Sequence, residues 1–237
     1  MSEENSMSAL GTPETKMTIR LMDRNLTESA ELKAKQSKPP RRSHAERSGE
    51  TRQKLCESAL LLLSEVGYER VTTASIAQHA QVSKGAQTHH FPTKVDILAA
   101  AFEYLLDGWR ERRLQLMSQN DGTPTLEDTV RYLWREVFNR PDYIAAIELM
   151  LAARHDGPLR TKLQELLANW TVARDDMFRR VAGLDVDLDK ASTFLRLNFC
   201  VLRGMALYEG LNETSDLNEP VLELWISMAR QHLTTQA

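Results

Sequence analysis

Apolar residues recur along most of the chain with the period of an α-helix. The first periodic segment covers residues 49–66, and its inner positions are Leu55, Ala59, Leu62 and Val66. Gly67 follows directly, at the position after the last turn where many helices end. Later periodic segments cover residues 94–118, 125–138, 141–154, 158–182, 188–210 and 219–234. Convincing strand alternation and hairpin turns are absent from the sequence, so we expect an all-α fold.

Three helix start signals follow one another between residues 72 and 98. Thr72 and Ser83 are candidate N-caps of two short helices joined by a tight turn. Thr93 is a candidate cap of a third helix, with Asp96 three residues later as in a capping box. A short helix braced by one helix before it and one after it is what a helix-turn-helix needs to enter the DNA major groove.

Residues at many spaced positions between 52 and 98 carry a family resemblance. They are Gly67-Tyr68, Thr72, Ile76-Ala77, Val82-Ser83, Lys84-Gly85-Ala86, His89-His90-Phe91 and Lys94. In this pattern the chain resembles the DNA-binding domain of the tetracycline-repressor (TetR) family. The resemblance implies a helix-turn-helix domain over residues 49–95, joined by a long helix to a helical ligand-binding and dimerisation domain over residues 96–237.

The chain departs from the family pattern at three positions. The family usually has Gly where this chain has Gln81, so we expect a left-handed backbone there on a residue that carries a Cβ. The family usually has Leu and Tyr where this chain has Gln87 and Thr88, and that Tyr commonly contacts DNA. The fold assignment is unaffected, but the base-contacting chemistry must differ.

The residues expected to contact DNA lie in and around the second short helix. Lys84 lies at a helix N-terminus that favours phosphate, and Gly85 lets the DNA backbone approach. A Gln side chain can pair with adenine, and Thr can offer its methyl group to thymine. The resemblance implies that position 87 faces the core and that His90 and Lys94 touch phosphate; in that case Thr88 and His89 contact the bases. The predicted set is Thr72, Thr73, Ser83, Lys84, Gly85, Gln87, Thr88, His89, His90 and Lys94.

Aromatic and histidine side chains near this helix have simpler interpretations. Tyr68 either hydrogen-bonds a phosphate or packs with its hydroxyl in water. Phe91 is expected in the core. His89 and His90 point about a quarter-turn apart on a helix, so we predict no metal site there.

A small-molecule site in the second domain is implied by the resemblance, because in the family its filling separates the DNA-binding heads. The candidate lining residues are Trp134, Phe138, Met150, Arg154, Trp170, Phe178 and Asn198. Aromatic residues at helical spacing are also typical of plain core. Asn198 lies on an apolar face and needs a partner, which is a ligand, a backbone carbonyl or the other subunit. The expected effector is apolar or amphipathic.

The last two periodic segments also carry apolar residues away from their main stripes: Leu195, Phe199, Leu202 and Ile226. These positions belong either to the core of one subunit or to a contact with another. The resemblance implies that the last two helices pair with those of a second subunit in a four-helix bundle. Such a homodimer presents two recognition helices to a palindromic operator in double-stranded DNA.

The net charge of −3 is not typical of a nucleic-acid-binding protein, so attraction to phosphate must come from local clusters. Residues 1–48 have few large apolar side chains, and we predict a disordered extension. Its distal part and the next residues are basic: Lys33, Lys35, Lys38, Arg41, Arg42, Arg47, Arg52 and Lys54. This segment is either an arm that follows phosphates or a solvated linker.

Composition and motifs narrow the function further. Cys56 and Cys200 both lie in apolar helical patterns and are expected as buried free thiols of a cytoplasmic protein. The polar N-terminus and short apolar runs predict no membrane partner. Phosphate loops, nucleophile elbows and metal-ligand spacings are absent from the sequence, so we predict no enzyme activity, cofactor or metal. The prediction is a ligand-released transcriptional repressor; the alternative is a helical interaction protein of the same fold without specific operator binding.

Overall fold

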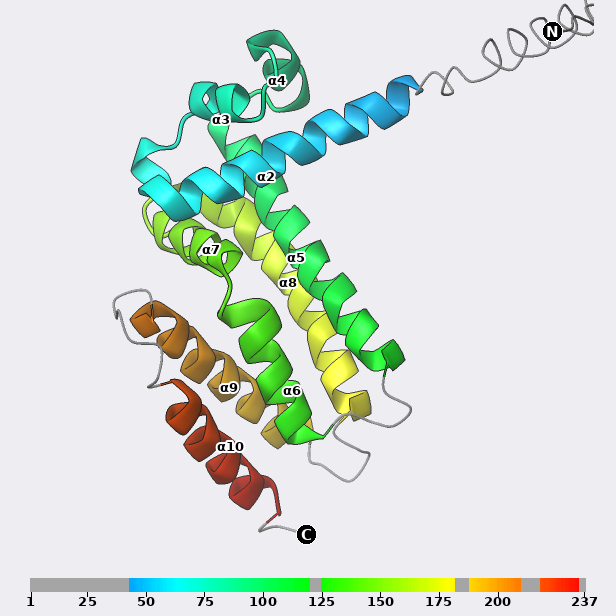
Figure 1. Cartoon of the computed structure of the whole chain (residues 1–237), viewed down its shortest axis with the longest axis vertical. Coiled ribbons are helices and arrows are strands. Elements are labelled where there is room, and N and C mark those ends of the chain that lie inside the picture. Colours follow the sequence, from blue (N-terminus) through cyan, green and yellow to red (C-terminus); the bar gives the residue numbers. More distant parts are fainter. Residues whose placement is uncertain (1–42, 120–124, 182–187, 210–217, 235–237) are drawn as a thin grey trace, which may run out of the picture. The chain divides into compact units, whose positions relative to one another are not determined.

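The computed structural model describes residues 43–119, 125–181, 188–209 and 218–234, and every regular element in these ranges is a helix. With the labels of Figure 1, the elements are α2 (His44–Arg70), α3 (Thr73–His79), α4 (Lys84–His90), α5 (Lys94–Gln119), α6 (Leu126–Leu133), the π-helical turn η1 (Trp134–Phe138), α7 (Pro141–Ala152), α8 (Gly157–Val181), α9 (Leu188–Glu209) and α10 (Asn218–Thr234). The predicted all-α fold is confirmed.

The start and end of α2 differ from the sequence prediction. The helix begins at His44, five residues before the predicted start at residue 49, and Ser43 caps it by accepting a hydrogen bond from the Glu46 amide at 3.1 Å. At its other end Gly67 takes a positive φ of 76°, which favours glycine and interrupts the helix as the sequence predicted. Residues 1–42, including most of the predicted extension, lie outside the described residues.

The helices α2, α3 and α4 gather around the N-terminal end of α5 (Figure 1). We call residues 48–95 the head. Its core is built together with the first turns of α5, from apolar side chains of α2, α3, the C-cap of α4 and α5: Leu55, Ala59, Leu63, Ile76, Phe91, Ile97, Leu98 and Phe102, each nearly inaccessible to solvent. Burying one such large side chain contributes about 1.5–3 kcal/mol. This core fixes α4 against α2 and α5, and leaves the opposite face of α4 in solvent.

The long helix α5 starts in the head and continues beyond it, where it packs side by side with α8 (Figure 1). The buried face of α5 carries Leu98, Phe102, Leu105, Leu106 and Trp109. The core continues through α6, η1, α7 and α9 with Val130, Trp134, Phe138, Tyr143, Leu149 and Leu202. The segment predicted as one helix over residues 125–138 is instead α6 followed by the π-helical turn.

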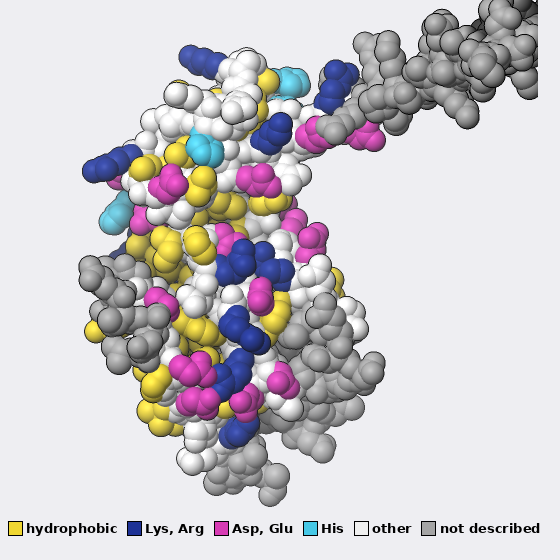
Figure 2. Space-filling view, viewed as in Figure 1, with side chains coloured by type: hydrophobic (Ala, Val, Ile, Leu, Met, Phe, Trp, Pro, Cys, Tyr) yellow, Lys and Arg dark blue, Asp and Glu magenta, His cyan; other side chains and the backbone are white. Residues whose placement is uncertain are grey.

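Charged side chains join α6 to α10. Arg131 of α6 donates hydrogen bonds to Glu127 at 3.0 Å, to Glu219 at 2.5 Å and to Glu223, while Arg230 of α10 reaches Glu127. Figure 2 shows acidic and basic side chains interleaved over this part of the molecule. The network adds polar contacts to the apolar packing of α10 by Leu222 and Ile226, both buried.

The two cysteines differ in environment. Cys56 is a buried free thiol, as predicted, whereas Cys200 is exposed on α9. The prediction for Cys200 was wrong because one side of α9 faces solvent, and position 200 lies on that side of the helix.

Candidate nucleic-acid interface

The two short helices of the head are fixed by their caps. The Thr72 hydroxyl accepts from the Ser75 amide at 3.0 Å and the Ser75 hydroxyl accepts from the Thr72 amide at 3.0 Å, so these residues form a capping box. Ser83 caps α4 by accepting from the Ala86 amide at 3.2 Å. Both predicted N-caps are confirmed.

The turn between α3 and α4 contains the one non-glycine residue with positive φ in the described ranges, Gln81, at 55°. This confirms the left-handed backbone expected there. The neighbouring amide of Val82 donates to the Ala77 carbonyl at 2.9 Å, which closes the turn against α3. The turn therefore keeps the geometry that joins the helices, at the modest cost that a Cβ imposes on this conformation.

The solvent face of α4 carries Lys84, Gly85, Thr88 and His89, all exposed. A Cβ placed on Gly85 would meet no atom within 4 Å, so this side of the helix is open. Thr88 and His89 are adjacent on the exposed surface. The predicted contacts at Lys84, Gly85, Thr88 and His89 thus share one accessible face. Of the other predicted residues, Ser83 and Thr72 are exposed with capping hydroxyls, and Thr73 is half-buried.

Gln87 is buried and does not lie where a base-contacting residue would lie. Its side chain is only 3% exposed, and its Nε2 donates to the Phe91 carbonyl at 2.7 Å. An amide held in the core cannot reach a base edge. The assignment of Gln87 to DNA is therefore corrected: it closes the end of α4 beneath the exposed pair Thr88 and His89.

His90 lies half-buried at the end of α4 beside Arg52. Desolvation lowers its pKa, with smaller contributions from the charges of His89 and Arg52. The imidazole is therefore mainly neutral near pH 7. The Arg52 guanidinium lies 4.7 Å from the centre of the Phe91 ring, a cation–π contact that joins α2 to the end of α4.

Lys94 faces the protein. Its Nζ donates to the Tyr68 carbonyl at 2.8 Å and lies 3.9 Å from the centre of the Tyr68 ring. Desolvation lowers the pKa of Lys94, and the carboxylates of Glu69 and Asp156 oppose that shift. The side chain is thus engaged inside the molecule, away from the face formed by Thr88 and His89.

Tyr68 fits neither of the two interpretations predicted for it. Its hydroxyl donates to Oδ2 of Asp156 at 2.7 Å, and its amide donates to Oε2 of Glu148 at 3.1 Å. Burial is the main cause that raises the pKa of Tyr68 to about 12, and the bond to Asp156 adds to it. Sequence reasoning missed these contacts because the partners lie 80 and 88 residues away, and no local pattern connects them.

The predicted ligand-binding residues lie in several different environments. Trp134 and Phe138 belong to the packed core, with the Phe138 ring 4.6 Å from Tyr143 and 5.3 Å from Phe199. Trp170 joins the same aromatic group through Phe199, at 5.8 Å between ring centres. The side chain of Phe178 lies outside the described residues.

The other three predicted residues lie elsewhere. Met150 and Arg154 line an open surface hollow of about 350 Å³ between α7 and α8, together with Arg160, Leu163 and Leu167. Asn198 is 1% exposed and its Oδ1 accepts from Trp225 Nε1 at 2.7 Å. Its partner is therefore a side chain of α10 in the same subunit, which none of the three predicted alternatives named.

One aromatic residue that the prediction left out has an unsatisfied polar atom. Trp109 is 6% exposed, its ring centre lies 5.6 Å from Tyr143 and 6.0 Å from Trp170, and its indole N–H has no hydrogen-bond partner among the described residues. Nearby, Arg203 Nε donates to the Tyr143 hydroxyl at 3.0 Å. Buried polar atoms without partners are uncommon in native proteins.

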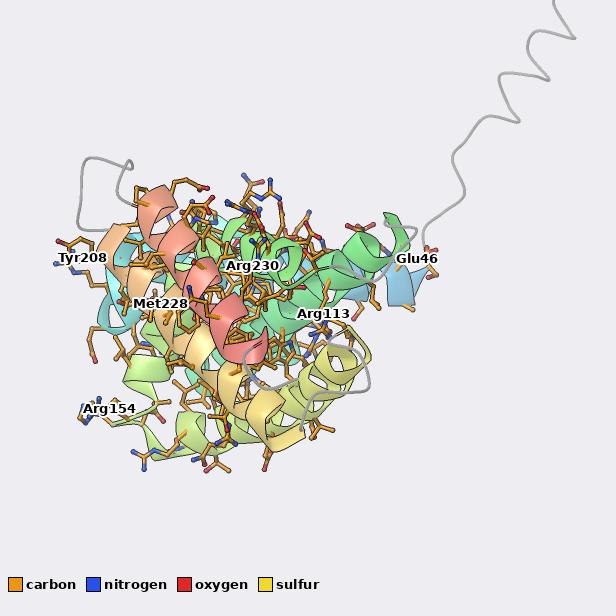
Figure 3. The ribbon with its side chains drawn as sticks, turned by 90° about the horizontal axis from the view of Figure 1, so that it is seen from below. Glu46, Arg113, Arg154, Tyr208, Met228 and Arg230 are labelled. Atoms are coloured by element: carbon orange, nitrogen blue, oxygen red, sulfur yellow. The ribbon has the colours of Figure 1, made fainter. Side chains whose placement is uncertain are left out.

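Apolar side chains remain exposed along α9 and α10. They are Leu197, Leu207 and Tyr208 on α9, and Val221, Leu224 and Met228 on α10. Figure 3 shows the two helices side by side and labels Tyr208 and Met228 on them. The spacing of Leu197 and Tyr208, and of Val221 and Met228, places each pair on one helical stripe.

Two negative findings concern the described residues alone. In those parts of the chain, no group of three or more His, Cys, Asp or Glu side chains is placed to hold a metal ion. Within the same ranges, none of the helices combines the length and hydropathy needed to cross a lipid bilayer.

The head thus has the geometry of a helix-turn-helix module: a capped α3, a turn at Gln81 and an α4 with one open face. Comparison with known proteins agrees with this class. Residues 55–101 match the family described as bacterial regulatory proteins, tetR family. The HTH-type transcriptional regulator CymR of Pseudomonas putida is 33% identical over 199 residues, covering 81% of this chain and 96% of CymR.

Solved structures share the fold. A transcriptional regulator from Rhodococcus sp. Rha1 superposes with a TM-score of 0.62 at 21% identity, covering 76% of this chain and 96% of that one. The multidrug binding protein EbrR, complexed with imidazole, has a TM-score of 0.55 at 22% identity, covering 75% and 93%. The chain belongs to the tetR family of bacterial regulatory proteins and is a DNA-binding transcriptional regulator.

Proposed function

We propose that this regulator represses transcription by occupying a palindromic operator as a homodimer, with α4 of each subunit in the major groove. The observation that carries the proposal is the exposed pair Thr88 and His89 on the open face of α4, with Gln87 buried beneath it. Thr88 and His89 contact bases, while Ser83, Lys84 and the backbone at Gly85 contact phosphates. Thr72 and Thr73 lie at the start of α3, where that helix crosses the DNA backbone.

The exposed apolar stripes of α9 and α10 support the dimer. Leu224 is 63% exposed and Tyr208 is 60% exposed, and contiguous apolar surface of this kind marks a protein interface. Pairing of these helices with their copies buries both stripes and sets two copies of α4 about one DNA turn apart. The head and the helical domain then have separate roles in DNA binding and in assembly.

The effector is a small apolar or amphipathic molecule that binds in the helical domain. The aromatic group around Trp109 supports this site, because the buried indole N–H lacks an acceptor within the described parts of the chain and Arg203 lies near. EbrR, a neighbour of the same fold, is a multidrug binding protein. A thermal-shift screen of small compounds tests the site: hits should raise the melting temperature of the native protein, and Trp109→Phe should abolish that shift.

Fluorescence anisotropy tests the DNA-binding proposal. The protein is titrated into a labelled fragment from upstream of its own gene, at physiological salt, with excess unrelated DNA. Saturable binding that survives the competitor supports a sequence-specific regulator. If that fragment fails, selection from random DNA follows, and failure there would favour the interaction protein of the same fold.

A further inference from the structure

Tyr68 joins the head to the helical domain at two atoms. From the end of α2 its amide reaches Glu148 on α7, and its hydroxyl reaches Asp156 in the turn before α8. Asp156 also caps α8, because its Oδ1 accepts from the Leu159 amide at 2.9 Å. Both bonds from Leu159 and Tyr68 lower the pKa of Asp156, so its carboxylate is charged at neutral pH. One carboxylate therefore sets the start of α8 and the position of Tyr68 together.

The backbone approaches closely at the same place. Gly67 has a φ of 76°, and a Cβ built on it would lie 3.3 Å from Oε2 of Glu148. A residue with a side chain would strain the backbone at this position, and its Cβ would crowd the carboxylate that accepts the hydrogen bond from the Tyr68 amide. The end of α2 is thus shaped to seat against α7.

Lys94 connects Tyr68 to the end of α4. It is the first residue of α5, and Phe91, the C-cap of α4, precedes it by three residues. Its Nζ holds the Tyr68 carbonyl and packs on the Tyr68 ring. Turning Lys94 toward a DNA phosphate would break a charge-assisted hydrogen bond and a cation–π contact in a partly desolvated site. The position of Lys94 therefore favours a role inside the protein.

An ion pair also acts on the start of α5. Lys162 of α8 pairs with Asp96 at 2.5 Å, and Asp96 accepts from the amide of Thr93 at 3.0 Å. The first turn of α5 is thus tied to α8 by Lys162 and to α2 by Lys94. A shift of the segment from Glu148 to Lys162 must move the start of α5, and with it the end of α4.

We propose that Lys94, Tyr68 and Asp156 are positioning residues for operator binding: they set the angle of α4 from the helical domain, and Lys94 makes no phosphate contact. The inference rests on the proposed function, since it concerns the same operator complex. It departs from the resemblance, which implied that Lys94 touches phosphate. Because these residues touch no base, they act on specific binding through the placement of α4 alone.

The salt dependence of DNA affinity separates the two roles of Lys94. The logarithm of the DNA-binding constant falls linearly with the logarithm of the salt concentration, and each lost phosphate contact makes that slope less steep by about 0.9. For a dimer that loses one contact per subunit, the slope becomes less steep by about 1.8. Lys84→Ala, which removes an exposed cation at the start of α4, should show this loss and serves as the control. Lys94→Ala should keep the wild-type slope and weaken operator binding ten-fold or more, with affinity for unrelated DNA unchanged.

Two further variants test the chain of contacts without removing a cation. Tyr68→Phe removes only the hydroxyl, and Asp156→Asn keeps a side chain that caps α8 well. Each should lower the ratio of operator to unrelated-DNA affinity several-fold, and the double variant should add little to either single change. Melting temperatures identify any variant that fails to fold. In that case the ratio of operator to unrelated-DNA affinity is measured on the single variant that does fold.

The outcomes are distinguishable from failure of the proposed function. If the wild-type protein shows no competitor-resistant binding to any DNA, the proposed function fails first. If it binds an operator but Lys94→Ala lowers the salt slope as Lys84→Ala does, Lys94 contacts phosphate and the inference is overturned. An unchanged affinity ratio in both Tyr68→Phe and Asp156→Asn would overturn it as well.

Discussion

Trp225 on α10 donates a hydrogen bond from Nε1 to Oδ1 of Asn198 on α9, at 2.7 Å. Asn198 is 1% exposed, and the Trp225 ring stacks on Phe194 with 5.8 Å between ring centres. The bond joins the two helices that carry the exposed apolar stripes. The buried amide therefore orients the indole and helps to hold α10 against α9.

Asn198→Ala should therefore destabilise the protein by about 1–3 kcal/mol, because the indole N–H loses its acceptor in a partly buried site. Urea denaturation at one fixed protein concentration measures the change, since dimerisation links stability to concentration. Thr193→Ala, at an exposed position on the same helix, is the control and should change the free energy of unfolding little. Equal effects of the two substitutions would contradict the structural role of Asn198.

Gln87→Leu tests the correction made to the predicted base contacts. Leucine keeps the volume of a buried side chain but removes the bond to the Phe91 carbonyl, so stability should change by about 1 kcal/mol or less. The preferred DNA sequence should stay the same, as determined by competition with operator variants. A changed preference at one base pair would show that Gln87 leaves the core when DNA binds.

The sequence predicted what local patterns control. Thr72, Ser83 and the Thr93–Asp96 pair were found as caps because capping depends on residues three apart. The left-handed backbone at Gln81 was expected from the resemblance, because the family usually has Gly at that position. The contacts of Tyr68 and Asn198 could not be predicted, because their partners are distant in the sequence and are brought near only by the packing of the helices. The ligand-binding set stays a prediction, since the period of the apolar residues alone does not show which helices face one another.

Leu224→Arg should break the proposed dimer. The charge would be buried without a partner if α10 packs against its copy, so the variant should sediment as a monomer in analytical ultracentrifugation. Operator affinity should fall ten-fold or more, because one head then binds alone. Val172→Arg, at a position on α8 of similar exposure, is the matched control and should remain dimeric. A dimeric Leu224→Arg would place the interface elsewhere.

Cys56 gives the protein a dependence on alkaline pH. Burial raises the pKa of its thiol from 9.0 to about 11, so the folded state retains a proton that the unfolded chain loses between these values. The contribution of this thiol to the free energy of unfolding is fully present below pH 9, and it should fall by about 1.4 kcal/mol per pH unit as pH rises toward 11.

Tyrosines with raised pKa values, such as Tyr68, contribute to the same alkaline loss. The contribution of Cys56 is therefore the difference between the native protein and Cys56→Ala. Urea denaturation of both at pH 8 and pH 10.5 measures it: the native protein should lose more free energy of unfolding across this interval than the variant. Equal losses would show that the thiol titrates near its ordinary pKa.

Selection from random DNA with the native protein, Thr88→Ala, His89→Ala and Lys84→Ala tests whether the exposed face of α4 recognises the operator. A palindromic sequence is expected for the native protein, and a changed preference at particular base pairs for Thr88→Ala and His89→Ala. Lys84→Ala should keep the native preference with weaker binding. Recovery of one unchanged sequence by Thr88→Ala and His89→Ala alike would contradict recognition by this face.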